Sequence, residues 1–425
     1  MTATTKRLLR VVDARDIDRL RRNPVDRETL LAASALVDEV EGGGEPQLRA
    51  IAERFGDRSP GERLVIGKPE LDAALESLPA EDRSALEAAA DNIRRFAEAQ
   101  RASLSGFGMP ASSPGTLRQE IIPVQRAGCY APGGRFPLPS SVLMTAIPAR
   151  VAGVESITVA SPRPAQITLA AAAVAGADRV LAVGGAQAIA AMAYGIAVDP
   201  VDVIVGPGNR WVTAAKQLVS GTVRIDMLAG PSELVVIADD SADPRVVAAD
   251  LLAQVEHDTD ASAILLSSSE RLIELVAREL CRQLEDLPTG ATARKALENG
   301  YATLTDSNEQ SAELADRLAP EHLQIMTADP AKLAASIRHA GALFIGPHTA
   351  EVFGDYGIGP NHTLPTGGTA RSFAGLSVFD FLRIRTAIHL TEIPNKQLIR
   401  TTAKLARLEG LEAHARAAEI RIRPT

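Results

Sequence analysis

Short apolar runs alternate with alanine-rich, helix-like runs through much of this chain, and this alternation constrains the fold more than any other feature. One series occupies residues 156–219 and a second occupies residues 233–345. The strand-like runs are largely apolar, which is typical of parallel strands covered by helices on both faces. The pattern therefore predicts an α/β protein with two parallel sheets of the Rossmann-like type.

The segments outside these series mainly predict helices. Apolar residues at three- and four-residue spacing favour helices over residues 11–20, 27–40 and 71–99, and we expect these helices to pack on the second sheet. Clusters rich in glycine and proline predict loops over residues 42–46 and 105–115. The end of the chain is also predicted to be helical.

Composition limits the possible functions. The 425 residues, 46% hydrophobic and 23% charged, suffice for two or three domains with a sizeable core. A net charge of −8 argues against a nucleic-acid-binding surface. Cys129 and Cys281 lie far apart, which fits a reducing cytoplasm rather than a disulfide framework. No apolar run approaches the roughly 20 residues of a membrane span, and the first residues lack a signal-peptide pattern. We therefore expect a cytoplasmic protein without a membrane or nucleic-acid partner.

A first candidate site lies on a predicted helix that begins with Asp243 as N-cap and Pro244 at the first helical position. Asp250, Gln254 and His257 are spaced i, i+4 and i+7, so we expect them on one face of this helix. The amide oxygen of Gln254 and the imidazole of His257 can share a metal ion. The alternative is that this is only the solvated face of a helix.

A second candidate site is Ala319-Pro320-Glu321-His322. Because proline disfavours the α region at the residue before it, Glu321 and His322 are expected at a helix-to-strand junction. A carboxylate beside an imidazole is a natural acid/base pair. The alternative is a loop glutamate beside a histidine with structural contacts only.

The histidines point to the second half of the chain, because all seven follow residue 250. The glycine- and proline-rich segment 353–371 carries Asp355 and His362, and long loops inside compact domains are usually functional. Asp355 is a candidate metal ligand, and His362 is a candidate ligand or substrate contact. The alternative is a set of turns in which Asp and Asn cap their own backbone. His414, on the polar tail, is by default an exposed side chain.

Cofactor motifs are weak. The chain lacks the G-x-G-x-x-G fingerprint and the P-loop. Two glycine-rich turns, 184–187 and 206–209, follow predicted strands and open predicted helices, so a ligand can approach the backbone closely and phosphate can meet a helix N-terminus. Tyr130, beside Gly133-Gly134, can stack on a flat ring. The alternative for all three is ordinary strand-to-helix turn chemistry.

Taken together, these stretches resemble the histidinol dehydrogenase family over nearly the whole chain. The resemblance rests on nine motifs in order: Gly128-Cys-Tyr-Ala-Pro-Gly-Gly-Arg135, Gly184-Gly-Ala-Gln-Ala-Ile-Ala, Gly206-Pro-Gly-Asn, Ala229-Gly-Pro-Ser-Glu233, Gln254-x-x-His257-Asp, Ala319-Pro-Glu-His-Leu, Gly354-Asp-Tyr, Gly359-Pro-Asn-His-Thr-Leu-Pro-Thr and Glu409-Gly-Leu-x-Ala-His414. Each motif is weak alone, but the ordered set is very specific.

The resemblance implies an enzyme that uses NAD and one Zn²⁺ per subunit. Matched by position, the zinc ligands are Gln254, His257, Asp355 and His414, the last supplied by the partner subunit of a homodimer through an exchanged C-terminal tail. The acid/base pair is Glu321 and His322. The implied substrate contacts are Ser232, Gln254, His257, His322, Asp355, Glu409 and His414, with His362 near the substrate. The implied NAD contacts are Tyr130, Gln187 and Asn209.

The family's fold implies two incomplete Rossmann-like domains with a small N-terminal arm and the exchanged tail. The expected division is a helical arm over 1–25, a larger α/β domain with the zinc and acid/base residues over 26–128 plus 233–376, an NAD-binding domain over 129–232 and the tail over 377–425.

The implied reaction is the last step of histidine biosynthesis. L-Histidinol is oxidised through L-histidinaldehyde to L-histidine, and two NAD⁺ are reduced in turn. His322 would take the hydroxyl proton, and Glu321 would activate the water that attacks the aldehyde. Cys129 lies near the cofactor stretch, but nothing close in sequence activates its thiol, so it is interpreted as a small buried residue. Asp250 is not among the implied ligands.

Three alternatives compete with this interpretation. A related dehydrogenase of another small alcohol, such as a sulfonated diol, would share the motifs. A non-catalytic, zinc-stabilised dimer would keep the fold, but the intact Glu321-His322 pair argues against it. A metal-dependent hydrolase would use the same zinc and Glu321, but the glycine-rich turns argue against that.

Overall fold

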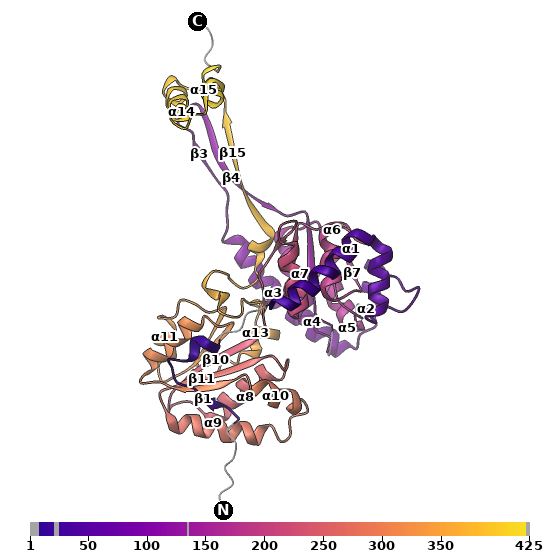
Figure 1. Cartoon of the computed structure of the whole chain (residues 1–425), viewed down its shortest axis with the longest axis vertical. Helices are drawn as coiled ribbons and strands as arrows, with labels where there is room; N and C mark the ends of the chain where they lie inside the picture. Colours follow the sequence, from indigo (N-terminus) through magenta and orange to yellow (C-terminus); the bar gives the residue numbers. More distant parts are fainter. Residues whose placement is uncertain (1–7, 21–24, 134–135, 422–425) are drawn as a thin grey trace, which may run out of the picture.

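The computed structural model describes residues 8–20, 25–133 and 136–421. Gly134 and Arg135, which belong to the first motif, lie outside the described residues. Two α/β units adjoin each other, and a long arm leads away from them to a pair of helices near the C-terminus (Figure 1). No helix in the described ranges is long and apolar enough to cross a membrane.

The first sheet has the order β2-β7-β6-β5-β8-β9, and its neighbours are parallel except for β2 against β7. Its strands are β2 (Val65–Gly67), β5 (Arg126–Tyr130), β6 (Ser156–Ala160), β7 (Arg179–Leu181), β8 (Val203–Val205) and β9 (Arg224–Ile225). The helices that connect them are α4 (Pro139–Ala152), α5 (Gln166–Val174), α6 (Gly185–Tyr194) and α7 (Arg210–Val219). The alternation predicted over residues 156–219 is confirmed.

The second sheet has the order β1-β12-β11-β10-β13-β14, and all its neighbours are parallel. Its strands are β1 (Arg10–Val11), β10 (Glu233–Ala238), β11 (Ser262–Ser267), β12 (Tyr301–Leu304), β13 (His322–Met326) and β14 (Ala342–Ile345). Its helices are α8 (Pro244–Val255), α9 (Glu270–Gln283), α10 (Gly290–Leu297), α11 (Asn308–Leu318) and α12 (Pro330–Ala334). The predicted class, an α/β protein with Rossmann-like parallel sheets, is confirmed.

The three α-helices before residue 103 pack on the first sheet and not on the second. They are α1 (Arg27–Arg54), α2 (Lys68–Glu76) and α3 (Ala80–Ala102). Val37 and Ile51 of α1 share a buried cluster with Leu181 of β7. The expected packing of these helices on the second sheet is therefore wrong, whereas Ile17 does pack against Val235 and Ile237 of the second sheet, as expected for residues 11–20. Apolar spacing identifies the buried face of a helix but not the surface that covers it.

Three local predictions are wrong. Helix α1 continues through residues 42–46 with a kink at Gly44 (φ 62°), because the buried residues after the kink keep that half packed. Residues 11–20 are not one helix, since Arg10–Val11 pairs with β12 and only Ile17–Leu20 forms a 3₁₀ helix. The expected loop over 105–115 contains strand β3 (Phe107–Pro110), whose backbone pairs with β4.

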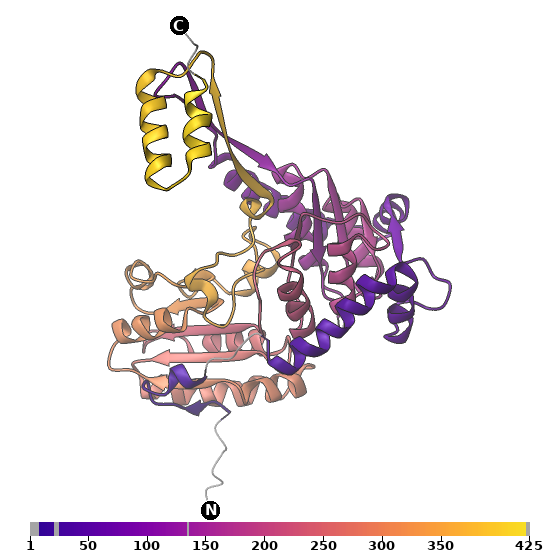
Figure 2. The same cartoon turned by 45° about the horizontal axis from the view of Figure 1, so that its top comes forward.

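The arm consists of an antiparallel sheet and a helical hairpin. Its strands run in the order β15-β4-β3, where β4 is Gly115–Pro123 and β15 is Leu382–Leu390. Beyond β15, α14 (Lys396–Leu408) and α15 (Glu412–Glu419) confirm the predicted helical tail and lie far from both large sheets in the two views (Figures 1 and 2). Ile388 and Ile420 are 72% and 80% exposed. The arm thus presents apolar side chains to solvent.

Candidate active site

The amino ends of β10 and β13 bring Glu233, Glu321 and His322 together, because the two strands are parallel neighbours. Before β13, Ala319 takes the left-handed conformation (φ 50°) at the end of α11, and Pro320 turns the chain into the strand. The predicted helix-to-strand junction is confirmed. Ligands of open α/β sheets usually bind at the carboxyl ends of the strands. This cluster lies at the opposite edge.

Glu321 is buried and held by the main chain. Its Oε2 accepts a hydrogen bond from the N–H of Glu233 at 2.9 Å. Burial raises the pKa of the carboxyl well above its ordinary value; the hydrogen bond opposes this shift, and the charges of Glu233, Glu351 and Asp355 add to it. Such a carboxyl holds a proton more readily than an ordinary glutamate, as an acid/base group must.

His322 is buried beside Glu321. Its Nδ1 lies 3.3 Å from the carbonyl oxygen of Glu233 and 3.6 Å from Oε2 of Glu321. Because a carbonyl oxygen only accepts, the ring hydrogen belongs on Nδ1 and the lone pair on Nε2. Burial lowers the pKa of the imidazole to about 4, although Asp355 acts in the opposite direction. The neutral ring can therefore take a proton at Nε2.

Sequence reasoning missed Glu351, which directly precedes α13 (Val352–Tyr356). Its Oε1 lies 3.5 Å from Nε2 of His322, and its side chain is 1% exposed. Neither carboxylate oxygen has a hydrogen-bond partner among the described residues. Burial first, and then the charges of Asp355 and Asp250, raise its pKa to about 8. The sequence feature that could have identified Glu351 is its i, i+4 spacing from Asp355, because this spacing places two carboxylates on one side of a helical turn.

Asp355 joins the cluster from α13. Ligand atoms of His322, Glu351 and Asp355 lie within 4.8 Å of one another. Oδ1 of Asp355 lies 3.4 Å from Nδ1 of His362. Burial by itself raises the pKa of Asp355, but the hydrogen bond from His362 and the charges of His362, His322 and His257 lower it overall. These nitrogen and oxygen donors suit a divalent metal such as zinc.

Helix α8 contributes Gln254 but not His257. The predicted N-cap is confirmed, since the side chain of Asp243 accepts from the N–H of Arg245. The helix ends at Val255, however, so the expected i, i+4, i+7 face stops at Gln254, and His257 lies exposed on the following turn. The chain leaves the helix here because the carboxylate of Asp258 accepts from the N–H of Asp260 in a local turn.

The amide of Gln254 tests whether the site fits a metal. The residue is 0% exposed, and neither Oε1 nor Nε2 has a partner among the described residues. A buried polar atom without a hydrogen-bond partner costs about 1–3 kcal/mol. Buried amides are therefore normally paired, and we expect a ligand to bind this one. A metal ion bound to Oε1 would satisfy the acceptor half of this amide. Asp250, one turn earlier, is buried, and burial raises its pKa to about 6.

The other expected substrate contacts are spread over the chain. Ser232 directly precedes β10 and is half-buried. Glu409 and His414 are exposed residues of the helical hairpin. Both views place that hairpin at the tip of the arm, away from α8 and α13 (Figures 1 and 2). Within one chain, the structure does not bring Glu409 or His414 to the cluster.

The expected NAD contacts lie at the carboxyl ends of the first sheet. Tyr130 ends β5 and accepts, through its hydroxyl, a hydrogen bond from the N–H of Gly185 at 3.0 Å. Burial raises the pKa of this tyrosine to about 12. Gln187 is also buried, on α6. Asn209 is exposed and caps α7 by accepting from its first N–H groups. The three residues share one edge of the sheet, but only Asn209 presents its side chain to solvent.

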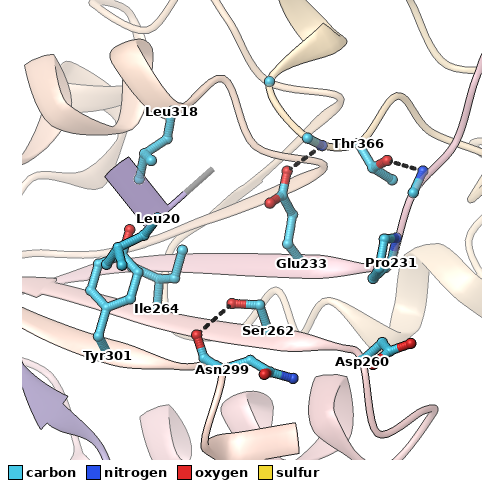
Figure 3. A pocket seen from close by; sticks show the side chains of 13 residues that line it. Leu20, Pro231, Glu233, Asp260, Ser262, Ile264, Asn299, Tyr301, Leu318 and Thr366 are labelled. Atoms are coloured by element: carbon cyan, nitrogen blue, oxygen red, sulfur yellow. Dashed lines mark hydrogen bonds between the residues drawn. The ribbon is translucent and has the colours of Figure 1, made fainter. Parts of the chain in front are cut away.

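Residues that line a small cavity beside β10 hold the loop before that strand by hydrogen bonds (Figure 3). Oγ1 of Thr366 accepts from the N–H of Gly230, and Oε1 of Glu233 accepts from the N–H of Gly367 at 2.9 Å. These bonds join the loop before β10 to the segment that follows His362. They fix the main chain of Glu233, which contacts both members of the acid/base pair.

The chain thus combines two α/β units with a buried carboxylate–imidazole cluster, an arrangement suited to an α/β enzyme that moves protons. The family model described as "Histidinol dehydrogenase" matches residues 20–422, and the chain belongs to this family. The resemblance drawn from the motifs is confirmed, and with it the class, an NAD-dependent oxidoreductase.

Individual relatives agree with this assignment. Histidinol dehydrogenase from Thermus thermophilus is 50% identical over 350 residues, covering 82% of this chain and 84% of the relative. The one from Geobacillus kaustophilus is 45% identical over 394 residues, covering 91% and 92%. The crystal structure of histidinol dehydrogenase from Elizabethkingia anophelis is 31% identical and superposes with a TM-score of 0.90, covering 98% of each chain.

Proposed function

We propose that this chain oxidises L-histidinol through L-histidinaldehyde to L-histidine, with two NAD⁺ and one Zn²⁺ per subunit. The observation that carries the proposal is the buried cluster of Glu321 and His322 next to Asp355, in a chain of this family. A neutral imidazole and a carboxyl of raised pKa in one cluster are suited to two successive proton transfers.

The first oxidation needs a base for the hydroxyl proton. Nε2 of His322 carries the free lone pair, since Nδ1 faces the carbonyl oxygen of Glu233. The O–H bond breaks as Nε2 takes the proton, and the electron pair of the neighbouring C–H bond leaves as hydride. NAD, when bound, supplies the hydride acceptor in each half of the reaction. The base at Nε2 is free again once its proton has passed to solvent.

The second oxidation needs water. Glu321 takes a proton from the water that attacks the aldehyde carbon, which gives a hydrate. Removal of a second hydride and of a hydroxyl proton from the hydrate yields the carboxylic acid, and the two halves together remove four electrons. The hydrogen bond from the N–H of Glu233 keeps Glu321 in place for this step.

Gln254, His257 and Asp355 of one subunit, with His414 of the partner subunit, would hold the zinc. Zinc supplies a Lewis acid that orients the nitrogen atoms of the substrate. The orphaned amide of Gln254 and the influence of His257 on Asp355 support the first three ligands. The substrate would also contact Ser232 and His362, together with Glu409 of the partner subunit. NAD would contact Tyr130, Gln187 and Asn209.

The position of the tail supports a homodimer. Glu409 and His414 belong to the hairpin of α14 and α15, which lies at the end of an arm that leads away from both large sheets (Figures 1 and 2). The apolar side chains exposed there, such as Ile388 and Leu408 (72% and 69%), provide surface for a second copy to cover. Two free cysteines, one of them buried, fit the reducing cytoplasm in which we place the enzyme.

The test is turnover of purified, zinc-loaded protein with NAD⁺ and L-histidinol, compared with a sulfonated diol as alternative substrate. We expect kcat/KM to be higher for L-histidinol by several orders of magnitude. Comparable values for the two substrates would favour a dehydrogenase of other small alcohols. Absence of turnover with either, at full zinc content, would favour a non-catalytic dimer.

A further inference from the structure

Glu351 has no part in the proposed chemistry, yet its surroundings are those of a functional group. Its side chain is 1% exposed, and neither oxygen has a hydrogen-bond partner in the described part of the chain. Burial strips a carboxylate of its water, so an unpaired one destabilises the fold. An apolar residue of similar size would serve stability better. We therefore expect Glu351 to serve catalysis rather than stability.

The geometry around His322 supplies one. Nδ1 is engaged by the carbonyl oxygen of Glu233 at 3.3 Å, and Nε2 lies 3.5 Å from Oε1 of Glu351. Glu351 thus faces the nitrogen that gains a proton. Among the described residues, no lysine or arginine forms an ion pair with Glu351, Glu321 or Asp355. A proton on Nε2 places positive charge beside a carboxyl group whose pKa is raised by burial and by neighbouring carboxylates, and that charge favours its ionised form.

We propose that Glu351 is a positioning residue for His322: it orients the imidazole and stabilises the imidazolium that forms when Nε2 takes the hydroxyl proton of the substrate. The O–H bond breaks, the N–H bond forms at Nε2, and the hydride leaves the adjacent carbon. The effect is electrostatic, because opposite charges at this separation attract strongly where water is excluded. The proposal rests on the proposed function, in which His322 is the base.

Two alternatives predict different behaviour. If Glu351 were a further zinc ligand through its place beside Asp355, its loss would lower the zinc content. If it were purely structural, its loss would lower thermal stability together with activity. A positioning role predicts lower kcat with zinc content and stability retained, because only the charge beside Nε2 is removed.

The first test uses Glu351→Gln, which keeps the shape and removes the charge, with Asp380→Asn as a matched carboxylate-to-amide control outside the site. Asp380 caps a 3₁₀ helix, Val378–Phe381, near the arm. In zinc-loaded Glu351→Gln we expect kcat to fall by roughly tenfold or more, with KM for L-histidinol within about threefold of wild type. Zinc per subunit should be unchanged, and Tm should equal or exceed that of wild type. Asp380→Asn should keep wild-type kcat.

The second test is chemical rescue. In Glu351→Ala, added formate should restore part of kcat, because it supplies a carboxylate of the right size, and formamide should not. Wild-type kcat in Glu351→Gln, loss of its zinc, or equal rescue by the two additives would overturn the proposal. Turnover of wild-type protein is measured first: if the wild type does not oxidise L-histidinol, the proposed function itself fails, whereas a normal wild type with an unaffected Glu351→Gln overturns only the role of Glu351.

Discussion

The carbonyl oxygen of Glu233 lies 3.3 Å from Nδ1 of His322. The N–H of the same residue donates to Glu321 at 2.9 Å. The main chain of one residue, at the amino end of β10, therefore holds both members of the acid/base pair. Its own position depends on the loop before β10, which Thr366 and Gly367 fix from another segment of the chain.

Thr366→Val should weaken this support without touching the acid/base side chains. The N–H of Gly230 loses its acceptor, and Thr366 is 1% exposed, so we expect the free energy of unfolding to fall by about 1–3 kcal/mol. We also expect kcat to fall while zinc content stays at the wild-type level. Urea denaturation and steady-state kinetics measure the two effects. Thr401→Val, exposed on α14, is the control and should change neither.

How much the sequence predicts differs from element to element. Strand β10 and helix α7 have the predicted bounds because β10 is a continuous apolar run and α7 begins directly after a glycine-rich turn. The partner of α1 was not predictable, since apolar spacing does not say which sheet a helix covers. Helix α1 also passes through Gly44 and Pro46, where local propensity favours a loop and tertiary packing prevails.

Some residues of the candidate active site were predictable from the sequence and others were not. Glu321 and His322 are predictable because proline marks the end of a helix, and His322 begins the next strand. His257 lies two residues beyond the end of the helix on which its spacing placed it. Glu351 was not predicted because an isolated glutamate forms no recognisable sequence motif. Only the fold brings it close to Nε2 of His322. The role of His414 came from the family resemblance alone.

His414→Ala should lose zinc if the tail completes the neighbouring site. We expect less than about one tenth of the wild-type zinc after dialysis, since removing one of four ligands weakens binding strongly. Mixing His414→Ala with His257→Ala subunits should restore activity in the mixed dimers, because one of the two sites then has all four ligands. Full zinc content in His414→Ala, or inactive mixed dimers, would refute the exchanged tail. His348→Ala is a matched control.

Breaking the buried pair of Lys216 and Asp226 should strongly destabilise the first α/β unit. Their side chains are 2% and 0% exposed, and Lys216 also donates to the carbonyl oxygen of Gly206 at 3.0 Å. Lys216→Met leaves a buried carboxylate without its cation, so we expect the free energy of unfolding to fall by about 3–5 kcal/mol. Lys295→Met, which removes an exposed pair, should change it by less than about 1 kcal/mol.

Cys129 should be chemically inert. Burial raises the pKa of its thiol to about 12, so the reactive thiolate is scarce at pH 8. We expect iodoacetamide to label Cys281, which is only partly buried, and to leave Cys129 unmodified in the folded enzyme. Peptide mass spectrometry reads out both sites. Cys129→Ala should retain kcat; a large loss without unfolding would instead indicate covalent chemistry at this thiol.

The central claim is that one site performs two successive oxidations. Purified, zinc-loaded enzyme is given limiting L-histidinol and excess NAD⁺, and the NADH formed per L-histidinol consumed is counted, with His322→Ala as the blank. Two NADH per L-histidinol, with L-histidine as the product, is the result that the account predicts. A single NADH per L-histidinol, with the aldehyde released, would contradict it.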